Sequence, residues 1–388
     1  MKPSGPILPG GTLGVLGGGQ LGRMFAHAAQ QLGYRTVVLD PDSDSPAGSI
    51  AHQQVQTDYL DAQGLATLAA SCDAVTTEFE NVPAPALARL AEQLPVAPAA
   101  EAVAVCQDRA REKQHFRDCG VPCAPFAVIE TDAQLQAVDP GLLPGILKTA
   151  RLGYDGKGQV RVASPAALQA AWDELGRVPC VLEQRLDLAF EVSVIVARNV
   201  QGELVHFPLQ QNLHRDGILA VTTVPAPDLT AELQARAIGA AETIAATLGY
   251  VGVLCVEFFV LRDGSLVANE MAPRPHNSGH YTLDACDVSQ FELQVRAMAG
   301  LPLVAPRLHS PAIMLNLLGD LWFRDGQAET EPPWEAVLAL PGTHLHLYGK
   351  RSARPGRKMG HLNITGASAS QVREVAQRCA ELLGLPGL

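Results

Sequence analysis

The sequence predicts an α/β protein, with α+β parts, that is divided into two or three domains. Its 388 residues exceed what one ordinary hydrophobic core organises, and the 47% hydrophobic and 18% charged content is that of a folded globular protein. Residues 12–17 are an apolar run followed by a glycine-rich turn, a helical stretch and a second apolar run, which predicts a βαβ opening. Later segments combine short strands with a glycine loop and a hairpin, so mixed sheets are expected as well.

Composition argues against several classes of protein. A net charge of −11 disfavours a nucleic-acid-binding surface, which needs clustered Lys and Arg. The sequence has no apolar run of about 18 residues that could span a bilayer, and its first residues lack the apolar core of a signal peptide. We therefore expect no nucleic acid or membrane partner and a cytoplasmic location. The 8 cysteines are scattered, with only Cys119 and Cys123 close together, so reduced thiols are expected.

The glycine-rich turn spans residues 17–22, with the sequence GGGQLG; a helix is expected over 21–32 and the next strand over 36–39. Its G-x-G-x-x-G spacing, followed about 20 residues later by Asp40, is the dinucleotide-binding fingerprint. An NAD-dependent dehydrogenase is therefore one hypothesis. Backbone amides at a helix N-terminus hold any phosphate, however, so a phosphorylated substrate fits equally well.

Polar residues follow the third predicted strand of this N-terminal region. Glu78 and Glu80 lie at the strand end where open α/β sheets place their sites, although capping or solvated roles would explain them equally well. The next helix is expected over 101–119. Lys113 follows Arg109 by one helical turn, and we expect its side chain to be solvated.

A second glycine-rich loop, residues 153–159 with the sequence GYDGKGQ, lies between two predicted strands. Its glycines allow close approach of the backbone to a ligand, and Lys148 and Lys157 add positive charge. The spacing is not that of the P-loop, which disfavours a P-loop nucleotidase. The segment predicts a strand–loop–strand flap that covers phosphates.

A predicted hairpin brings two carboxylates together. The Asp263-Gly264 pair predicts a two-residue turn, and the resulting register pairs Phe259 with Ala268 and Glu257 with Glu270. Like charges directly across a hairpin are destabilising, so a divalent cation between them is one explanation. Oxygen ligands favour Mg²⁺, with Mn²⁺ as a possible substitute. The alternative explanation is that the two glutamates are independent of each other and solvated.

A basic segment lies near the C-terminus of this acidic protein. Its cations are Lys350, Arg351, Arg354, Arg357 and Lys358. Such a concentration of positive charge favours a phosphate-bearing small molecule. A solvated loop is the alternative.

Five sequence blocks carry a family resemblance: 18–24 (GGQLGRM), 153–159 (GYDGKGQ), 212–218 (NLHRDGI), 272–280 (APRPHNSGH) and 354–363 (RPGRKMGHLN). In this order they resemble the ATP-grasp superfamily and, within it, the ligases that carboxylate 5-aminoimidazole ribonucleotide in purine biosynthesis. The match covers nearly the whole length of the chain.

The resemblance implies an ATP-grasp fold and a set of ligands. It predicts a Rossmann-like pre-grasp domain over residues 1–108, a small lid domain over 109–186 and a C-terminal mixed-sheet domain over 187–388. The implied substrates are ATP, bicarbonate and 5-aminoimidazole ribonucleotide, with Mg²⁺ as the metal and carboxyphosphate as the intermediate. The family tends to form homodimers, so a homodimer is expected.

The resemblance also implies roles for individual residues. Catalytic roles would belong to Arg274, Lys148, Tyr154 and Asp155, and metal binding to Glu257 and Glu270. The implied ATP contacts are Arg109, Lys148, Gly153, Tyr154, Asp155, Gly156, Lys157, Gly158, Gln159, Glu183, Gln184, Arg185, Leu186, Glu191, His214, Asn269 and Glu270. The implied contacts to the substrate ribonucleotide are Gly18, Gly19, Gln20, Leu21, Arg274, His276, Asn277, Lys350, Arg357 and Lys358.

One position departs from the superfamily pattern. Many ATP-grasp enzymes carry Asn two positions after the second metal-binding glutamate, whereas this chain has Ala272. A second metal ion would then be held more weakly or by another ligand, such as Asn277.

Three other functions compete with the carboxylating ligase. The nearest is a formate-dependent glycinamide ribonucleotide formyltransferase, which shares the architecture, although blocks 272–280 and 354–363 fit the carboxylating family better. A dehydrogenase leaves the second glycine loop and the paired glutamates unexplained. A non-catalytic phosphate-binding or metal-binding module leaves Lys148 and the flap without a role.

Overall fold

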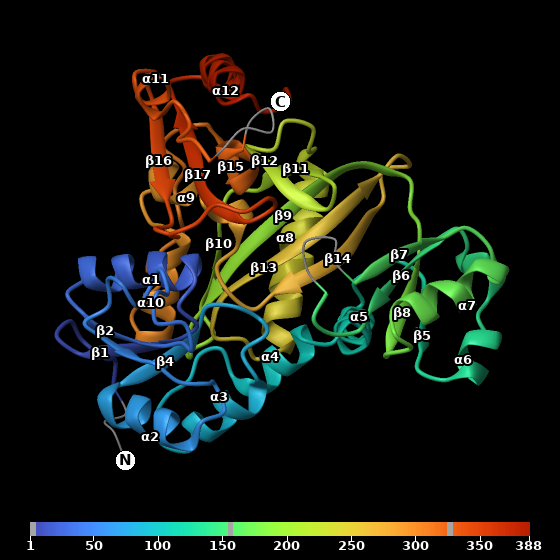
Figure 1. Ribbon diagram of the computed structural model, residues 1–388, viewed down its shortest axis with the longest axis horizontal. Coiled ribbons are helices and arrows are strands. Elements are labelled where there is room, and N and C mark those ends of the chain that lie inside the picture. Colours follow the sequence, from blue (N-terminus) through green and yellow to red (C-terminus); the bar gives the residue numbers. More distant parts are fainter. Residues whose placement is uncertain (1–4, 154–157, 324–328) are drawn as a thin grey trace.

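The computed structural model describes residues 5–153, 158–323 and 329–388, and these described residues form three β-sheets. Figure 1 shows the small sheet of the lid on the right, set apart from the blue N-terminal part on the left, with long strands between them. The expected α/β fold with an N-terminal Rossmann-like unit, a lid and a C-terminal mixed sheet is confirmed. No helix of the described residues is both long and apolar enough to cross a membrane.

The N-terminal sheet is four-stranded and parallel, in the order β3-β2-β1-β4, as the βαβ opening predicts. Its core includes Leu13, Val15 and Leu16, all fully buried. Its strands are β1 (Thr12–Leu16), β2 (Arg35–Leu39), β3 (Gln53–Val55) and β4 (Ala74–Thr77), and its helices are α1 (Gln20–Gln31), α2 (Ala62–Ser71), α3 (Ala84–Ala91) and α4 (Ala100–Cys106).

The lid sheet is antiparallel, in the order β5-β8-β6-β7. Leu147, Trp172 and Leu182 lie in its core. Its strands are β5 (Phe126–Ile129), β6 (Gly145–Thr149), β7 (Gln159–Val162) and β8 (Cys180–Gln184), and the helices of this part are α5 (Arg109–Asp118), α6 (Asp132–Gln136), η1 (Pro140–Leu142) and α7 (Pro165–Glu174). The predicted strand–loop–strand is β6–β7, and residues 154–157 of its loop lie outside the described residues.

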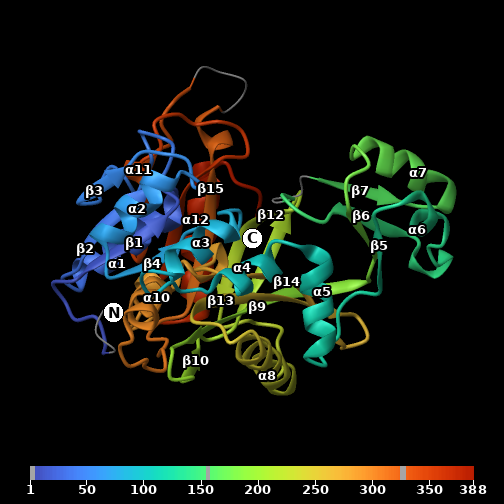
Figure 2. The same ribbon diagram turned by 90° about the horizontal axis from the view of Figure 1, so that it is seen from below.

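The single helix expected over 101–119 is wrong, because the chain breaks between α4 and α5. Asp108 has extended backbone there, and its carboxylate accepts from the amides of Ala110 and Arg111 at 3.1 and 3.3 Å. A side-chain cap of this kind begins a new helix. The break gives α5 a direction of its own between the N-terminal part and the lid (Figure 2).

The large sheet has nine strands, in the order β14-β13-β9-β11-β12-β15-β17-β16, with β10 paired to β9. Its strands are β9 (Leu188–Arg198), β10 (Leu204–His206), β11 (Gln210–Arg215), β12 (Ile218–Val224), β13 (Gly252–Leu261), β14 (Leu266–Ala272), β15 (Ala312–Leu318), β16 (Thr343–Leu347) and β17 (Lys358–Thr365). The helices around it are α8 (Ala231–Thr247), η2 (Asn277–Gly279), α9 (Thr282–Ala285), α10 (Gln290–Ala299), η3 (Gly319–Trp322), α11 (Trp334–Leu338) and α12 (Ala369–Leu383).

Alternation along β13 decides which side chains reach the site. Leu254 and Val256 pack in the core that α8 covers, whereas Val253 and Cys255 point to the opposite face, where α10 packs. Figure 2 shows α8 beneath β9 and β13. Because side chains of a strand alternate, Glu257 shares the face of Cys255.

The hairpin register is confirmed at the glutamates and wrong nearer the turn. Glu257 pairs with Glu270 as predicted, but Phe259 pairs with Val267 instead of Ala268. The turn contains three residues and has Gly264 at φ 82°, a loop that shifts the register by one. A bulge at Asn269 restores the predicted pairing, so the two departures cancel at the carboxylates.

Candidate active site

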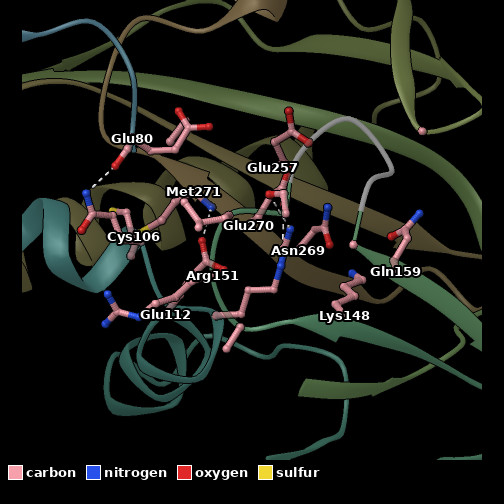
Figure 3. Close-up of a pocket in the computed structure, with 18 of the residues that line it drawn as sticks. Glu80, Cys106, Glu112, Lys148, Arg151, Gln159, Glu257, Asn269, Glu270 and Met271 are labelled. Carbon is pink, nitrogen blue, oxygen red and sulfur yellow. Dashed lines mark hydrogen bonds and ion pairs between the residues drawn. The ribbon is translucent and has the colours of Figure 1, made fainter. Parts of the chain in front are cut away.

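A cleft lies where the lid, the β13–β14 hairpin and the N-terminal part of the chain meet. Figure 3 shows Lys148 and Gln159 of the lid facing Asn269 and Glu270 of the hairpin. The sequence-predicted site residues that line it are Arg109, Lys148, Gly153, Gly158, Gln159, Glu191, His214, Glu257, Asn269, Glu270, Arg274, His276 and Lys358.

Other predicted residues lie away from this cleft. Glu183 and Asn277 are buried, and the side chain of Gln184 donates to the Gly141 carbonyl at 3.0 Å. Among the described residues, the cleft lining does not include Glu183, Gln184, Arg185, Leu186 or Asn277. Four predicted residues lie outside the described part of the chain: Tyr154, Asp155, Gly156 and Lys157.

The two hairpin carboxylates have different surroundings. Burial raises the pKa of Glu257 to about 7, with His214 opposing the rise and Glu270 adding to it. Burial also acts on Glu270, but Arg109 and Lys148 outweigh it and lower the pKa to about 2. Arg109 Nη1 lies 3.1 Å from Glu270 Oε2. At pH 7 Glu270 is therefore fully ionised, whereas Glu257 is only partly ionised, and a bound cation would favour its ionised form.

The donor atoms around this pair fit a hard divalent cation. Besides the two carboxylates, Asn269 Oδ1 is buried without a hydrogen-bond partner. Three oxygen donors from one hairpin are the ligand type that Mg²⁺ takes, with water and phosphate oxygens completing its octahedron. The bulge places Asn269 beside Glu270 on this edge.

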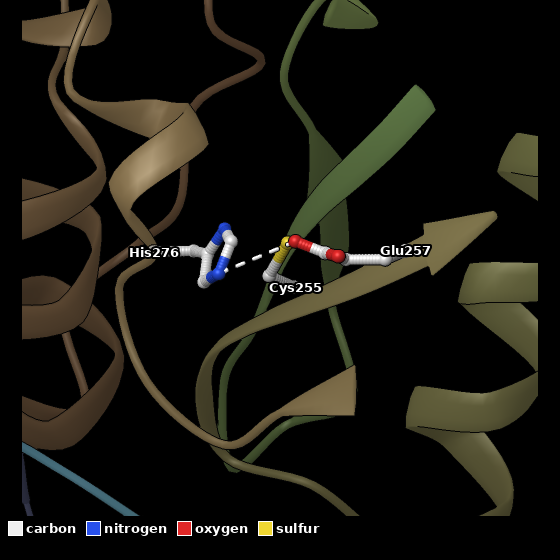
Figure 4. A group of neighbouring side chains, drawn as sticks. All are labelled: Cys255, Glu257 and His276. Atoms are coloured by element: carbon white, nitrogen blue, oxygen red, sulfur yellow. Dashed lines mark ion pairs between the residues drawn. The ribbon is translucent and has the colours of Figure 1, made fainter. Parts of the chain in front are cut away.

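Glu257 also lies close to nitrogen and sulfur donors. His276 Nε2 is 3.3 Å from Glu257 Oε1, and Figure 4 shows the imidazole facing the carboxylate with Cys255 beside it. The possible ligand atoms of Cys255, Glu257 and His276 lie within 4.8 Å of one another. Burial, followed by the charge of Arg274, lowers the pKa of His276 well below its ordinary value, so the ring is neutral at pH 7.

Two lysines share one buried glutamate behind the cleft. Lys148 Nζ lies 3.0 Å and Lys113 Nζ 3.4 Å from the same Glu183 Oε2. Burial lowers the pKa of Lys148, and Glu183 opposes that effect. The expectation that Lys113 is solvated is wrong: it is fully buried, because α5 turns this face toward the hairpin and β8.

The preceding residue on α5, Glu112, is a second buried group that the sequence analysis did not identify. Glu112 Oε1 accepts from the Met271 amide at 2.7 Å, which ties α5 to β14. Burial raises its pKa to about 8, against the opposing charge of Lys113. No local sequence pattern indicated that Glu112 is buried, because the Arg-Glu-Lys run that contains it is typical of a solvated helix face.

Glu191 and His214 form an ion pair on adjacent strands of the large sheet. His214 Nδ1 lies 2.9 Å from Glu191 Oε2. Burial lowers the pKa of His214, but the bond to Glu191 and the charge of Glu257 outweigh it and raise the pKa to about 9. At pH 7 the imidazole is therefore charged, and the pair presents a polar group to the cleft.

We expect His214→Gln to remove part of the pH dependence of stability. The pKa of His214 rises from 6.5 to about 9 on folding, so its stabilisation is fully present below pH 6.5 and is lost as the pH rises through 9. The wild-type-minus-variant difference in unfolding free energy should fall by at most about 3 kcal/mol between about pH 6 and pH 10 in denaturant titrations. A constant difference would contradict the charged imidazole, and His309→Gln, at an exposed histidine, is the control.

Arg274 connects the cleft to the N-terminal part. Its Nε donates to Glu80 Oε2 at 2.5 Å, across 194 positions of sequence. Burial lowers the pKa of Arg274, but Glu80 outweighs it and raises the pKa, so the guanidinium stays charged. The sequence left open whether Glu80 was structural; its place after β4 was the available signal.

A second hollow lies beside the glycine-rich turn. It brings Gly18, Gly19 and Gln20 together with Lys350 and Arg357 of the basic segment, residues for which the family resemblance implies contacts to one ligand. Lys358 lines the first cleft instead. Tyr59, Glu78 and Phe79 line the second hollow as well.

Part of the expected phosphate cradle in this hollow is already engaged. The Gly18 amide donates to Asp40 Oδ2 at 2.6 Å, and the Gly19 amide donates to Glu78 Oε1 at 2.8 Å. The amides of Gln20 and Leu21 lie in the first turn of α1, where no carbonyl of the helix is placed to accept a hydrogen bond from them.

Three family models together match most of the chain. Residues 11–107 match the ribonucleotide synthetase preATP-grasp domain, residues 114–291 the ATP-grasp domain, and residues 312–375 the C-terminal domain of phosphoribosylaminoimidazole carboxylase. The first of these models covers the N-terminal sheet, the second covers the lid sheet and β9–β14 of the large sheet, and the third covers β15–β17 of the large sheet.

Relatives and solved structures agree with these models. N5-carboxyaminoimidazole ribonucleotide synthase of Brucella melitensis is 47% identical over 92% of this chain and 96% of its own length, and that of Bacillus subtilis is 42% identical over 92% of both.

Two solved structures of such enzymes overlay nearly the whole chain. An ADP complex of N5-carboxyaminoimidazole ribonucleotide synthetase has a TM-score of 0.89 at 40% identity and covers 98% of this chain and 99% of its own. The Aspergillus clavatus enzyme, solved with ADP and 5-aminoimidazole ribonucleotide, has a TM-score of 0.87 at 32% identity, covering 97% and 99%. Given the cleft and the hollow described above, this chain belongs to the N5-carboxyaminoimidazole ribonucleotide synthase family of ATP-grasp ligases.

Proposed function

We propose that the protein joins bicarbonate to the amine of 5-aminoimidazole ribonucleotide, with conversion of ATP to ADP and phosphate, in purine biosynthesis. The observation that carries the proposal is a pair of neighbouring sites: Glu80 and Lys358 line the cleft, and the residues next to them in the chain, Phe79 and Arg357, line the hollow. The cleft has paired carboxylates, an unpartnered amide oxygen and half-buried cations; the hollow has a helix N-terminus and a basic segment. A polyphosphate suits the first, and a ribonucleotide monophosphate suits the second.

ATP would occupy the cleft between the lid and the hairpin. Arg109 and Lys148 lie there as cations for its phosphates, and residues 153–159 would cover them. Mg²⁺ held by Glu257, Glu270 and Asn269 would neutralise charge on the phosphate oxygens as a Lewis acid. The Glu191–His214 pair would meet the ribose, because a carboxylate accepts from hydroxyl groups.

The carboxyl group moves in two steps. A bicarbonate oxygen attacks the γ-phosphorus, the bond to the β-phosphate oxygen breaks, and ADP leaves, giving carboxyphosphate. The ribonucleotide amine then attacks the carboxyl carbon, loses a proton and expels phosphate. Arg274, a charged guanidinium on the cleft wall, would stabilise the negative charge that both steps concentrate on oxygen.

The closed cleft would protect carboxyphosphate from water. The lid faces the hairpin across the cleft, so approach of β6–β7 would shield the phosphates from bulk solvent. His276 and Lys358 line the cleft on the side of the C-terminal strands and would hold the carboxyl donor or acceptor.

The ribonucleotide phosphate would bind in the second hollow. Lys350, Arg357 and Gln20 line this hollow, so the two cations and the helix-terminal amide of Gln20 would hold the phosphate, with the amide of Leu21 next to it in the first turn of α1. Gly18 and Gly19 would contribute only by letting the ligand come close to the backbone, since carboxylates already accept hydrogen bonds from their amides.

Two further parts of the proposal rest on the family resemblance: the domain bounds 1–108, 109–186 and 187–388, and a homodimer. A cytoplasmic location and Mn²⁺ as a substitute for Mg²⁺ complete the proposal, and they rest on the sequence pattern and on the oxygen ligands. Light scattering of the purified protein tests the dimer, and a mass of about one chain would contradict it.

Full ADP release is expected only when bicarbonate and 5-aminoimidazole ribonucleotide are both present, because the amine is the carboxyl acceptor. A coupled assay of ADP, with each substrate omitted in turn, measures this requirement. Full turnover with formate and glycinamide ribonucleotide would instead assign the protein to the competing formyltransferase chemistry.

A further inference from the structure

Lys113 is a fully buried lysine that the proposed chemistry leaves without a role. Its ammonium donates to the Asn269 carbonyl at 2.7 Å and lies 3.4 Å from Glu183 Oε2. It therefore joins α5, the bulge of the hairpin and the lid strand β8. Among the described residues that line the cleft, Lys113 is not present, whereas Lys148 is.

Lys148 and Lys113 compete for one carboxylate. Both ammonium groups lie within 3.4 Å of Glu183 Oε2, and the other oxygen of Glu183 is buried without a hydrogen-bond partner. A buried carboxylate that loses its only cation is strongly destabilised. If Lys148 were the sole partner of Glu183, every move of Lys148 toward a ligand phosphate would leave that carboxylate uncompensated.

We propose that Lys113 is a positioning residue: it stays with Glu183 as a resident counter-ion and thereby frees Lys148 for the phosphates of ATP. The Asn269 carbonyl holds the Lys113 ammonium in place, so this lysine cannot follow Lys148 into the cleft. The same bond fixes the bulge that carries Asn269 Oδ1 and Glu270. This inference rests on the proposed binding of ATP in the cleft.

The effect of Lys113 on ATP binding should therefore depend on Glu183. Without Lys113, Glu183 should retain Lys148, and ATP must then break that ion pair to bind. Without Glu183 as well, Lys148 loses its ion-pair partner, and the charge that still attracts it is that of Glu270, in the cleft itself. A merely structural lysine would instead have the same effect with or without Glu183.

A double-mutant cycle on ATP binding tests this dependence. Lys113→Met should raise the KM for ATP and the Kd of ATP, measured by calorimetry without the other substrates, about tenfold, with kcat within about threefold of wild type. In a Glu183→Gln background the same Lys113→Met change should alter both constants less than about twofold. An equal effect in both backgrounds, or none in the wild-type background, would overturn the inference.

Two further variants keep the test decisive. Arg111→Gln removes an exposed cation from the same helix, where Arg111 pairs with Glu101, and should leave the KM for ATP unchanged. If Lys113→Met does not fold, Lys113→Gln, which keeps a donor for the Asn269 carbonyl, replaces it in both backgrounds. Failure of the proposed function would appear separately, as a wild-type protein that neither binds ATP nor releases ADP.

Discussion

Replacing Glu270 by Gln is expected to abolish turnover while the fold stays intact. The variant keeps the shape of the side chain and loses the charge that Arg109 and Lys148 sustain. An amide cannot take the place of an ionised metal ligand, so kcat should fall at least about 10³-fold. Since the Glu270 side chain is 44% exposed, the loss of its ion pair should cost little stability.

ADP release measured across a range of Mg²⁺ concentrations, together with circular dichroism, checks this expectation. Glu292→Gln is the matched control, because Glu292 pairs with Arg296 on α10. Near-normal turnover of the Glu270 variant with unchanged Mg²⁺ dependence would refute the coordination role.

Arg274→Gln should give the second large loss. The guanidinium is the charged group that we place beside the developing oxyanions, and removal of one such donor costs about 10²–10³-fold in kcat. Its partner Glu80 would be left in the protein without that cation, so the melting temperature should fall as well.

A change at Glu80, the ion-pair partner of Arg274, separates the loss of activity from the loss of stability. Glu80→Gln retains the Arg274 charge while it weakens the same ion pair, so it should lower the melting temperature with a smaller loss of kcat. The combination Glu80→Gln with Arg274→Gln should recover stability relative to Arg274→Gln alone but not activity. Equal kcat for the two single variants would contradict a direct role of Arg274.

Local patterns predicted the elements of the fold well, because strands and helices follow from apolar periodicity. The βαβ opening, the strand–loop–strand and the glutamate pairing of the hairpin are all present. The Phe259 register failed, since a three-residue turn and a two-residue turn share the same Asp-Gly signal and only packing decides between them. The Glu257–Glu270 pairing survived because the bulge at Asn269 compensated.

The candidate site was harder to predict from residues alone. The glycine loops and the hairpin pointed to phosphate and metal, but individual roles came from the resemblance. Arg274 and Glu80 meet across 194 positions, and no local pattern contains that contact. Lys113 looked solvated because its neighbours on the helix are charged, whereas its burial depends on where β8 and β14 pack.

The carboxylates around the glycine-rich turn bear on what that motif means. A Cβ at Gly19 would come within 2.5 Å of Glu78 Oε1, and one at Gly17 within 2.3 Å of the Glu78 side chain. The acidic residue of the fingerprint, Asp40, accepts from the Gly18 amide and from the Tyr59 hydroxyl, at 2.6 and 2.8 Å. An NAD pyrophosphate would have to evict both acids before it could reach these amides. In this chain, then, glycine is required at these positions because another group lies close to the backbone. That group is the side chain of the protein's own Glu78.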